Sequence, residues 1–128
     1  MPRLLFSTKH DVSWIMIKPH AGIAEQFARA LMEEAFNAAH KLLTGDLKRQ
    51  VSADDLKESL ESMIAYGDGP ITHIEVMDTL EEWPDKQIKD VGWAYVAMGG
   101  DDFSEGVALV VTKEHMKLLI RSIKWGRP

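Results

Sequence analysis

The sequence predicts a single α+β domain over residues 1–128, with a mostly antiparallel five-stranded sheet and helices packed on one face. Three observations support this prediction. A long segment rich in helix formers follows a short apolar N-terminal region, three segments with strand patterning lie in the C-terminal half, and no repeat or low-complexity linker divides the chain. A chain of 128 residues also has the usual size of one domain with its own core. The predicted order of elements is ββααβββα.

The N-terminal third is predicted to hold a hairpin and a long helix. Residues 4–7 and 12–18 are apolar runs with aromatic and β-branched residues, separated by the polar residues 8–11. Pro19 does not fit the interior of a strand, and residues 20–45 are mostly good helix formers that end at Gly45, a favoured residue just after a helix. We therefore expect two strands followed by one helix over residues 20–45.

This predicted helix carries two apolar stripes about 100° apart. The first stripe consists of Ile23, Phe27, Leu31, Ala35, Ala38 and Leu42. The second consists of Ala24, Ala28, Met32, Phe36, Ala39 and Leu43. One sheet face is too narrow to cover both stripes, so we expect the second to pack against the next helix or against the same helix of a second subunit. The second alternative predicts a homodimer with Met32, Phe36 and Leu43 at its interface.

The remaining elements follow from shorter patterns. Residues 45–50 are polar and predict a loop, and residues 51–70 predict a helix in which Ser52 and Asp55 form a capping box. Residues 71–78, 92–98 and 106–112 alternate or run apolar and predict strands, with a charged connector over 80–90. Residues 113–125 predict a final helix, since Met116, Leu119, Ile120 and Ile123 share one helical face.

Charge and cysteine content narrow the classes of function. The net charge is −5 with mixed signs along the chain, which argues against a nucleic-acid partner. Residues 113–128 carry a net charge of +4, either to complement the end of a helix or to form a basic edge that meets an acidic partner. The absence of cysteine excludes disulfides, thiolate metal sites and a cysteine nucleophile. The first residues lack the apolar run of a signal peptide or membrane span, so we expect a cytoplasmic protein with no membrane partner.

The acidic loop after the fourth predicted strand allows two interpretations. Glycine and aspartate are the residues that a tight turn between apolar strands needs, which favours a plain turn. Alternatively, carboxylates of Asp101, Asp102 and Glu105 are the oxygen ligands that a hard cation prefers. The stretch GGDDF (99–103) resembles the GGDEF signature of diguanylate cyclases, in which the glycines admit a nucleotide and the acidic groups help to hold a metal. The resemblance covers five residues, with Asp102 where that family has Glu, and it does not extend to the rest of the chain.

Four side chains on two predicted strands are candidates for a ligand site. His73 and Glu75 lie two positions apart and so point to one face, as do Trp93 and Tyr95 on the next strand. If the strands pair with these faces together, an imidazole, a carboxylate and two amphipathic aromatic rings line one surface that could bind a small ligand or perform acid–base chemistry. The other interpretation is that this is the solvent face of a one-sided sheet.

The sequence thus favours a non-catalytic binding or protein-interaction module that acts as a homo-oligomer. No cofactor is expected, because the chain has no HxxxH or HExxH pattern, GxSxG elbow, P-loop or GxGxxG fingerprint. In size and composition the chain is similar to the small, acidic, cysteine-free proteins that bacteria carry on mobile elements, including immunity proteins. The alternative is a small ligand-binding domain or enzyme that uses the sheet face or the acidic loop.

Overall fold

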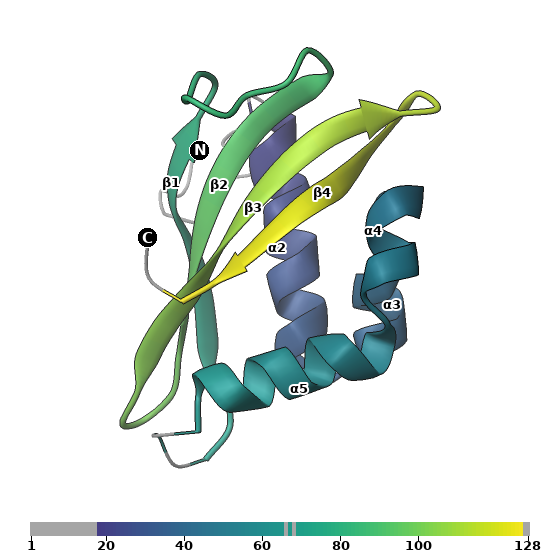
Figure 1. Cartoon of the computed structure of the whole chain (residues 1–128). Coiled ribbons are helices and arrows are strands. Elements are labelled where there is room, and N and C mark those ends of the chain that lie inside the picture. The colour runs from purple at the N-terminus through teal and green to yellow at the C-terminus, as the bar shows by residue number, and fades with distance from the viewer. Residues whose placement is uncertain (1–17, 66, 68, 127–128) are drawn as a thin grey trace, which may run out of the picture.

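The computed structural model describes residues 18–65, 67 and 69–126, in which four helices precede four strands (Figure 1). The helices are α2 (Pro19–Met32), α3 (Phe36–His40), α4 (Gly45–Gln50) and α5 (Ala53–Met63). The strands are β1 (His73–Leu80), β2 (Asp90–Gly99), β3 (Ser104–Glu114) and β4 (Lys117–Trp125). The chain is therefore α+β, and none of the described helices has the length and apolar character needed to cross a membrane.

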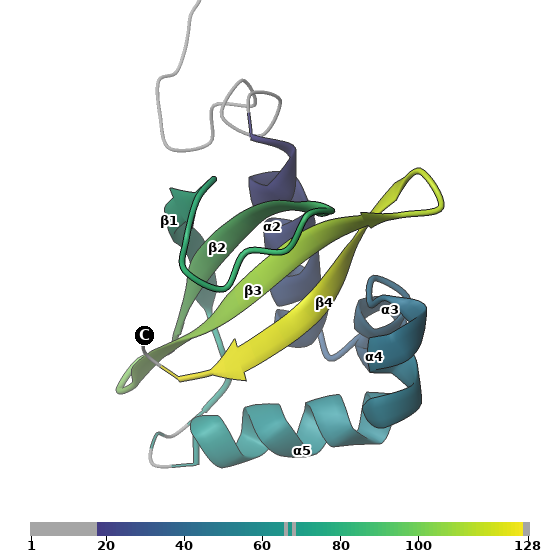
Figure 2. The same cartoon turned by 45° about the horizontal axis from the view of Figure 1, so that its top comes forward.

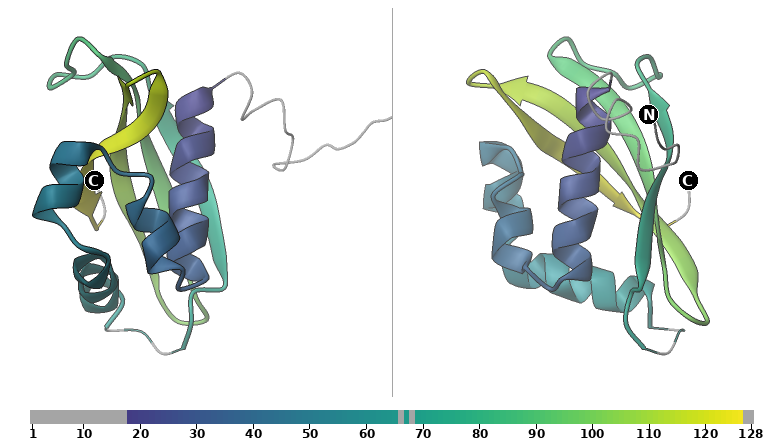
Figure 3. Two further views of the ribbon diagram at one scale, coloured as in Figure 1. Left: turned by 90° about the vertical axis from the view of Figure 1, so that its right-hand side faces the viewer. Right: turned by 180° about the vertical axis from the view of Figure 1, so that it is seen from behind.

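The four strands form an antiparallel meander in the order β1-β2-β3-β4. Helix α2 lies across one face of this sheet, and α3, α4 and α5 lie beside it at the β4 side and the lower end (Figures 1 and 3). We call the face against α2 the inner face and the opposite one the outer face. The core between α2 and the inner face includes Ala24, Phe27, Ala28, Leu31, Ala94, Val96, Met98, Val107, Leu109 and Val111. Alternate residues of β2 and β3 enter this core because side chains alternate across a strand.

The predicted strands over 71–78, 92–98 and 106–112 are confirmed as β1, β2 and β3, whereas the predicted five strands and their order are not. The two earliest predicted strands, 4–7 and 12–18, lie outside the described residues except for Lys18, which is not in a strand. The capping box is also confirmed: the Ser52 hydroxyl accepts from the Asp55 N–H, and the Asp55 carboxylate accepts from the Ser52 N–H. Helix α5 begins at this box, as the sequence predicts.

The prediction of one helix over 20–45 is wrong, because the chain turns sharply after α2. The Ala35 N–H donates to the Ala30 carbonyl and the Glu34 N–H donates to the Leu31 carbonyl, which is the Schellman pattern of a helix end. Glu34 takes the left-handed position of that motif, with φ of 60°. Glycine is the usual residue there, so a glutamate gives no sequence signal for the stop.

The prediction of a loop over 45–50 is also wrong. Thr44 caps the short helix α4, since its hydroxyl accepts from the Leu47 N–H. The segment just before α4 runs along β4: the Thr44 N–H donates to the Ile120 carbonyl, and the Ile120 N–H donates to the Leu42 carbonyl, both at 2.8 Å. These two hydrogen bonds attach the helical half of the chain to the β4 edge of the sheet.

The predicted final helix over 113–125 is instead the end of β3, a two-residue turn and strand β4. Val110 pairs with Ser122 while Val111 pairs with Ile120, so Arg121 is an extra residue in β4. This β-bulge shifts the alternation of side chains by one position. The residues of β4 that pack toward the core are consequently Leu118, Ile120, Ile123 and Trp125. The helical spacing of Met116, Leu119, Ile120 and Ile123 is misleading, because Met116 lies in the exposed turn and the bulge places Ile120 and Ile123 on the same face of a strand.

Candidate functional site

The four predicted ligand-binding side chains do share the outer face of the sheet. Glu75 pairs with Ala97 and Trp93 pairs with Leu80 across β1 and β2, and Tyr95 lies between Trp93 and Ala97 on the same face. His73 and Glu75 are exposed, and the two aromatic residues are half-buried. The strands thus pair with these faces together, and the shared surface is the solvent-facing side of the sheet.

Two of these side chains have a packing role that is visible in the geometry. The imidazole of His73 lies over Gly99, where a Cβ would meet its Nε2 at 2.5 Å. The ring of Tyr95 lies over Gly106 on β3, where a Cβ would meet its hydroxyl oxygen at 2.3 Å. Aromatic rings commonly cover glycines in this way and restore contacts that a strand glycine cannot make. His73 and Tyr95 thus lie flat on the sheet and do not frame a cavity.

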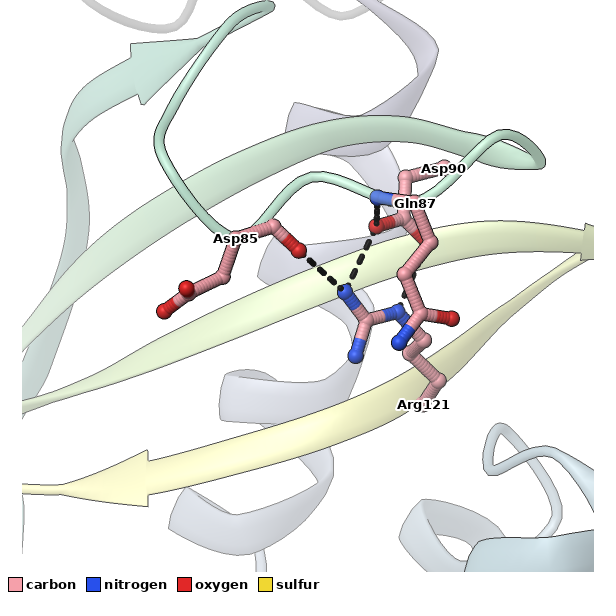
Figure 4. A network of polar contacts seen from close by, with 4 residues as sticks. All are labelled: Asp85, Gln87, Asp90 and Arg121. Atoms are coloured by element: carbon pink, nitrogen blue, oxygen red, sulfur yellow. Dashed lines mark hydrogen bonds and ion pairs between the residues drawn. The ribbon is translucent and has the colours of Figure 1, made fainter.

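The other end of the outer face holds a buried ion pair that sequence reasoning missed. Nε and Nη2 of Arg121 donate to the two carboxylate oxygens of Asp90 at 2.7 and 2.6 Å, and Nη2 also donates to the Asp85 carbonyl at 3.4 Å (Figure 4). The Gln87 N–H donates to the same carboxylate at 2.8 Å. Figure 4 shows the guanidinium in front of the sheet, with α2 behind it. This network holds the connector between β1 and β2 against the outer face.

The Asp90 carboxylate remains ionised in this environment. Burial acts to raise its pKa, but hydrogen bonds from Arg121, Gln87 and Thr112 together with the charge of Arg121 outweigh burial and lower the pKa below its ordinary value. The same pair raises the pKa of Arg121. Because the charges of Asp90 and Arg121 neutralise each other and hold the connector in place, we interpret this arrangement as a structural ion pair.

The acidic loop at 99–105 turns the chain around a buried phenylalanine. Phe103 is 6% exposed and occupies the space above Gly67 and Gly100, where an added Cβ would lie within 2.4 Å of its ring. Asp101 and Asp102 are exposed. Over the ranges that the structure describes, no group of three or more histidine, aspartate or glutamate side chains lies close enough to hold a metal ion. The geometry of the loop therefore supports the turn and gives no support to a cation site.

A groove at the C-terminal end of α2 combines two of the predicted interface residues with residues from α5. Its volume is about 310 Å³, near the lower end of the range of ligand pockets. It is lined by Leu31, Met32, Glu34, Phe36, Leu60, Glu61, Ile64, Gly69, Pro70 and Ile71. Leu31, Leu60 and Ile71 are buried and form its floor, whereas Met32 and Phe36 are half-buried. We call this feature the α2–α5 groove.

The third predicted interface residue is excluded from this groove. Leu43 is fully buried in the core of the single chain, beside the bridge to Ile120. The rest of the predicted second stripe is largely covered by the protein's own elements, since Ala24 and Ala28 of α2 and Ala39 of α3 are 0% exposed. The prediction that Leu43 faces a second subunit is therefore wrong, and the part of the stripe that reaches the surface is confined to Met32 and Phe36.

The rim of the α2–α5 groove is acidic. Glu34 and Glu61 are both exposed, and both line the opening. Glu34 has the left-handed backbone of the Schellman turn, a conformation that disfavours residues with a Cβ. The groove thus presents an apolar floor between two carboxylates. The sequence contains a signal for the floor in the apolar face of the predicted 51–70 helix, but none for the turn that places Glu34.

A second surface of opposite character lies at the tip of the β3–β4 hairpin. Met116 is 93% exposed, and the flanking residues Lys113, His115 and Lys117 are exposed as well. The acidic residue in this stretch, Glu114, is used internally because its carboxylate accepts from the Gly45 N–H at 3.1 Å. The tip is therefore an exposed apolar side chain with the lysines Lys113 and Lys117 near it. It contains part of the basic C-terminal segment that the sequence shows.

Two further cavities lie elsewhere on the described surface, one with a mixed lining and one with a mainly polar lining. One, of about 470 Å³, is lined by Glu58, Ser59, Ser62, Met63, Trp125 and Gly126. The other, of about 460 Å³, lies beside α4 and includes Gln50, Gln87, Lys89, Thr112, Lys113 and Glu114. Of the three cavities described, the α2–α5 groove alone has residues of the buried hydrophobic core, Leu31, Leu60 and Ile71, in its lining. None of the three is lined by His73, Glu75, Trp93 or Tyr95.

No protein-family model matches the chain, and comparisons with curated proteins and with solved structures find no match either.

Proposed function

We propose that the protein is a non-catalytic protein-interaction module whose binding site is the α2–α5 groove. The observation that carries this proposal is the groove's composition: an apolar floor of core residues, two half-buried apolar walls and two exposed carboxylates at the rim. Protein interfaces typically bury an apolar centre inside a polar rim. The outer sheet face and the acidic loop give less support for a binding site. Their aromatic residues His73, Tyr95 and Phe103 cover glycines, and the described acidic residues do not form a cluster.

The same composition defines the class of partner. The floor favours a protruding aliphatic or methionine side chain, and Glu34 and Glu61 favour lysine or arginine beside it. The lining of the groove holds no histidine, serine or cysteine, and its two carboxylates, Glu34 and Glu61, are exposed at the rim. The proposed ligand is therefore a basic protein segment with one exposed apolar side chain.

The proposal is tested with two short peptides of opposite charge. One carries a central methionine flanked by lysines, and its control carries the same methionine flanked by glutamates. We expect the lysine peptide to shift the methyl NMR signals of Ile64 and Ile71 in the groove and to leave that of Ile88, in the β1–β2 connector, unchanged. Added salt should weaken this binding because exposed charges are screened. If neither peptide shifts Ile64 or Ile71, the groove is not a peptide-binding site.

A groove variant gives the second arm of this test. Glu61→Lys changes an exposed residue of α5, so the fold should persist. We expect this variant to lose affinity for the lysine peptide and to gain affinity for the glutamate peptide. Unchanged preference would show that the rim does not select the partner by charge.

A further inference from the structure

We infer that the α2–α5 groove binds the β3–β4 hairpin tip of a second copy of this chain, with Met116 inserted into the groove. This inference rests on the proposed function and names the partner of that same site. The first argument is complementarity. The groove is apolar with Glu34 and Glu61 at its rim, and the tip is an exposed methionine with lysines on both sides.

The second argument comes from the backbone. Among the residues that the structure describes, three other than glycine have positive φ: Glu34 at 60°, His115 at 51° and Met116 at 65°. All three belong to the two surfaces in question. Two-residue hairpin turns with this backbone strongly favour Asn-Gly, so His115 and Met116 are unfavourable choices for folding alone. Strained positions of this kind cluster at functional sites.

The third argument is the placement of the two surfaces at opposite ends of the molecule. The ring of His20, near the start of α2, lies against Gly92, close to the end of the sheet that carries the hairpin tip. The groove lies at the other end of α2, about 20 Å away for a helix of 14 residues. Figure 2 shows the tip of the β3–β4 hairpin far from the lower end of the molecule, where α2 ends and α5 lies. One molecule cannot join its own tip and groove, whereas a second copy can.

This placement also suggests how the assembly closes. Two copies that lie side by side in opposite directions bring each hairpin tip to the other copy's groove. Both contacts then form, and neither copy has an unoccupied tip or groove. The arrangement is a two-fold dimer, which is the commonest form of homo-oligomer. It differs from a dimer in which the whole second stripe packs against a second subunit, because Leu43 of that stripe is buried within one chain.

Charge reversal at each surface tests the contact directly, with the molar mass measured by light scattering and sedimentation. Wild type should show twice the 14.4 kDa of one chain. Glu61→Lys alone and Lys117→Glu alone should each weaken dimerisation about tenfold or more, because like charges then face each other across the contact. An equimolar mixture of the two variants should recover the dimer, since each mixed pair has one restored and one original contact. The double variant should recover it as well.

A deletion of the inserted side chain gives an independent readout. Met116→Gly removes the side chain and suits the turn, so the variant should be monomeric and remain folded, as measured by circular dichroism. The control is Ile88→Ser, which alters another fully exposed apolar residue, at 99%, and should leave the dimer intact.

The outcomes separate this inference from the proposed function. A wild type that remains at 14.4 kDa even at millimolar concentration overturns the inference, and so does a mixture of variants that fails to recover the dimer. The peptide titration is repeated on Met116→Gly, whose own tip does not compete for the groove. Peptide binding by a monomeric wild type would retain the proposed function with another partner, whereas absence of both binding and dimer would refute both.

Discussion

Arg121 and Asp90 form a bidentate ion pair that spans strand β3, with one partner at the start of β2 and the other at the bulge of β4. The side chain of Asp90 is 0% exposed and that of Arg121 is 22% exposed. The pair therefore links three strands and the β1–β2 connector from the outer face. A buried pair of this kind is weak evidence of net stabilisation, but removal of one partner leaves an uncompensated charge.

Replacement of Asp90 by alanine is expected to lower the free energy of unfolding by about 3–5 kcal/mol, because Arg121 then remains partly buried without its partner. The measurement is urea unfolding followed by circular dichroism. The control is Glu82→Ala, which breaks the exposed Lys86–Glu82 pair and should change stability by about 0.5 kcal/mol or less. Equal effects of the two variants would show that burial of the Asp90 pair has no energetic consequence.

His20 is expected to make the fold sensitive to mild acid. The residue is 2% exposed, and within the described chain neither ring nitrogen has a hydrogen-bond partner. Burial first, and then the charge of Lys18, lower its pKa from the ordinary 6.5, and the charge of Glu81 opposes this only in part. The unfolded chain therefore binds a proton that the folded chain does not, and stability should fall as the pH drops below about 6.5.

Chemical unfolding over a range of pH, with wild type and His20→Phe compared, measures this effect. The phenylalanine keeps an aromatic ring over Gly92 but cannot titrate, so its stability should fall less between neutral pH and the lowered pKa of His20. The Asp90 pair loses its contribution only at more acidic pH, because the pKa of Asp90 lies below the ordinary carboxyl value. Parallel pH profiles for wild type and His20→Phe would contradict the prediction.

Two glycines of β2 should respond differently to the same substitution. In Gly92→Ala the new Cβ meets the buried ring of His20 at 2.3 Å, so we expect a loss of about 1–3 kcal/mol from overpacking. In Gly99→Ala the new Cβ meets the ring of His73, but that ring is exposed and can turn away. The loss there should stay within about 0.5 kcal/mol. His20→Ala should relieve the cost of Gly92→Ala, and a purely additive double variant would refute the proposed clash.

Glu34→Gly is expected to stabilise the isolated fold by about 0.5–1 kcal/mol, because glycine adopts the left-handed backbone of Glu34 without a steric cost. The matched control is the adjacent Glu33→Gly, at φ of −85°, where glycine only adds freedom to the unfolded chain and should destabilise. Thermal unfolding of both variants measures the difference. If both lower the melting temperature equally, the backbone of Glu34 is not strained.

The parts of the fold that the sequence predicts are those with local signals. The capping box at Ser52, the alternation along β2 and the glycine-rich turn before Phe103 depend on neighbouring residues, and the structure has all three. The failures occur where a tertiary contact overrides the local pattern. Glu34 stops a helix without glycine, and the bulge at Arg121 changes the side-chain period of β4.

The candidate site divides in the same way. Met32 and Phe36 were recognisable as surplus apolar residues of a helix, and the shared face of His73, Glu75 and Tyr95 followed from strand alternation. The acidic rim of the groove could not be predicted from the sequence. Glu34 and Glu61 come together only because α2 ends at Met32 and α5 returns beside that end. The exposed hairpin turn at Met116 could not be predicted either, because the apolar residues of 113–125 have the spacing of one helical face.

The two backbone bonds between residues 42–44 and Ile120 have a consequence for solubility. Strand β4 is the last strand of the described sheet, and it contains Leu118, Leu119, Ile120 and Ile123. An unprotected edge of this composition is a template on which further chains add as strands, the route to aggregation. In the folded protein the segment before α4 pairs with that edge at Ile120, near the middle of β4. Resistance to fibril formation therefore depends on the helical half staying docked, and conditions that release it before the sheet unfolds are those in which the protein would precipitate.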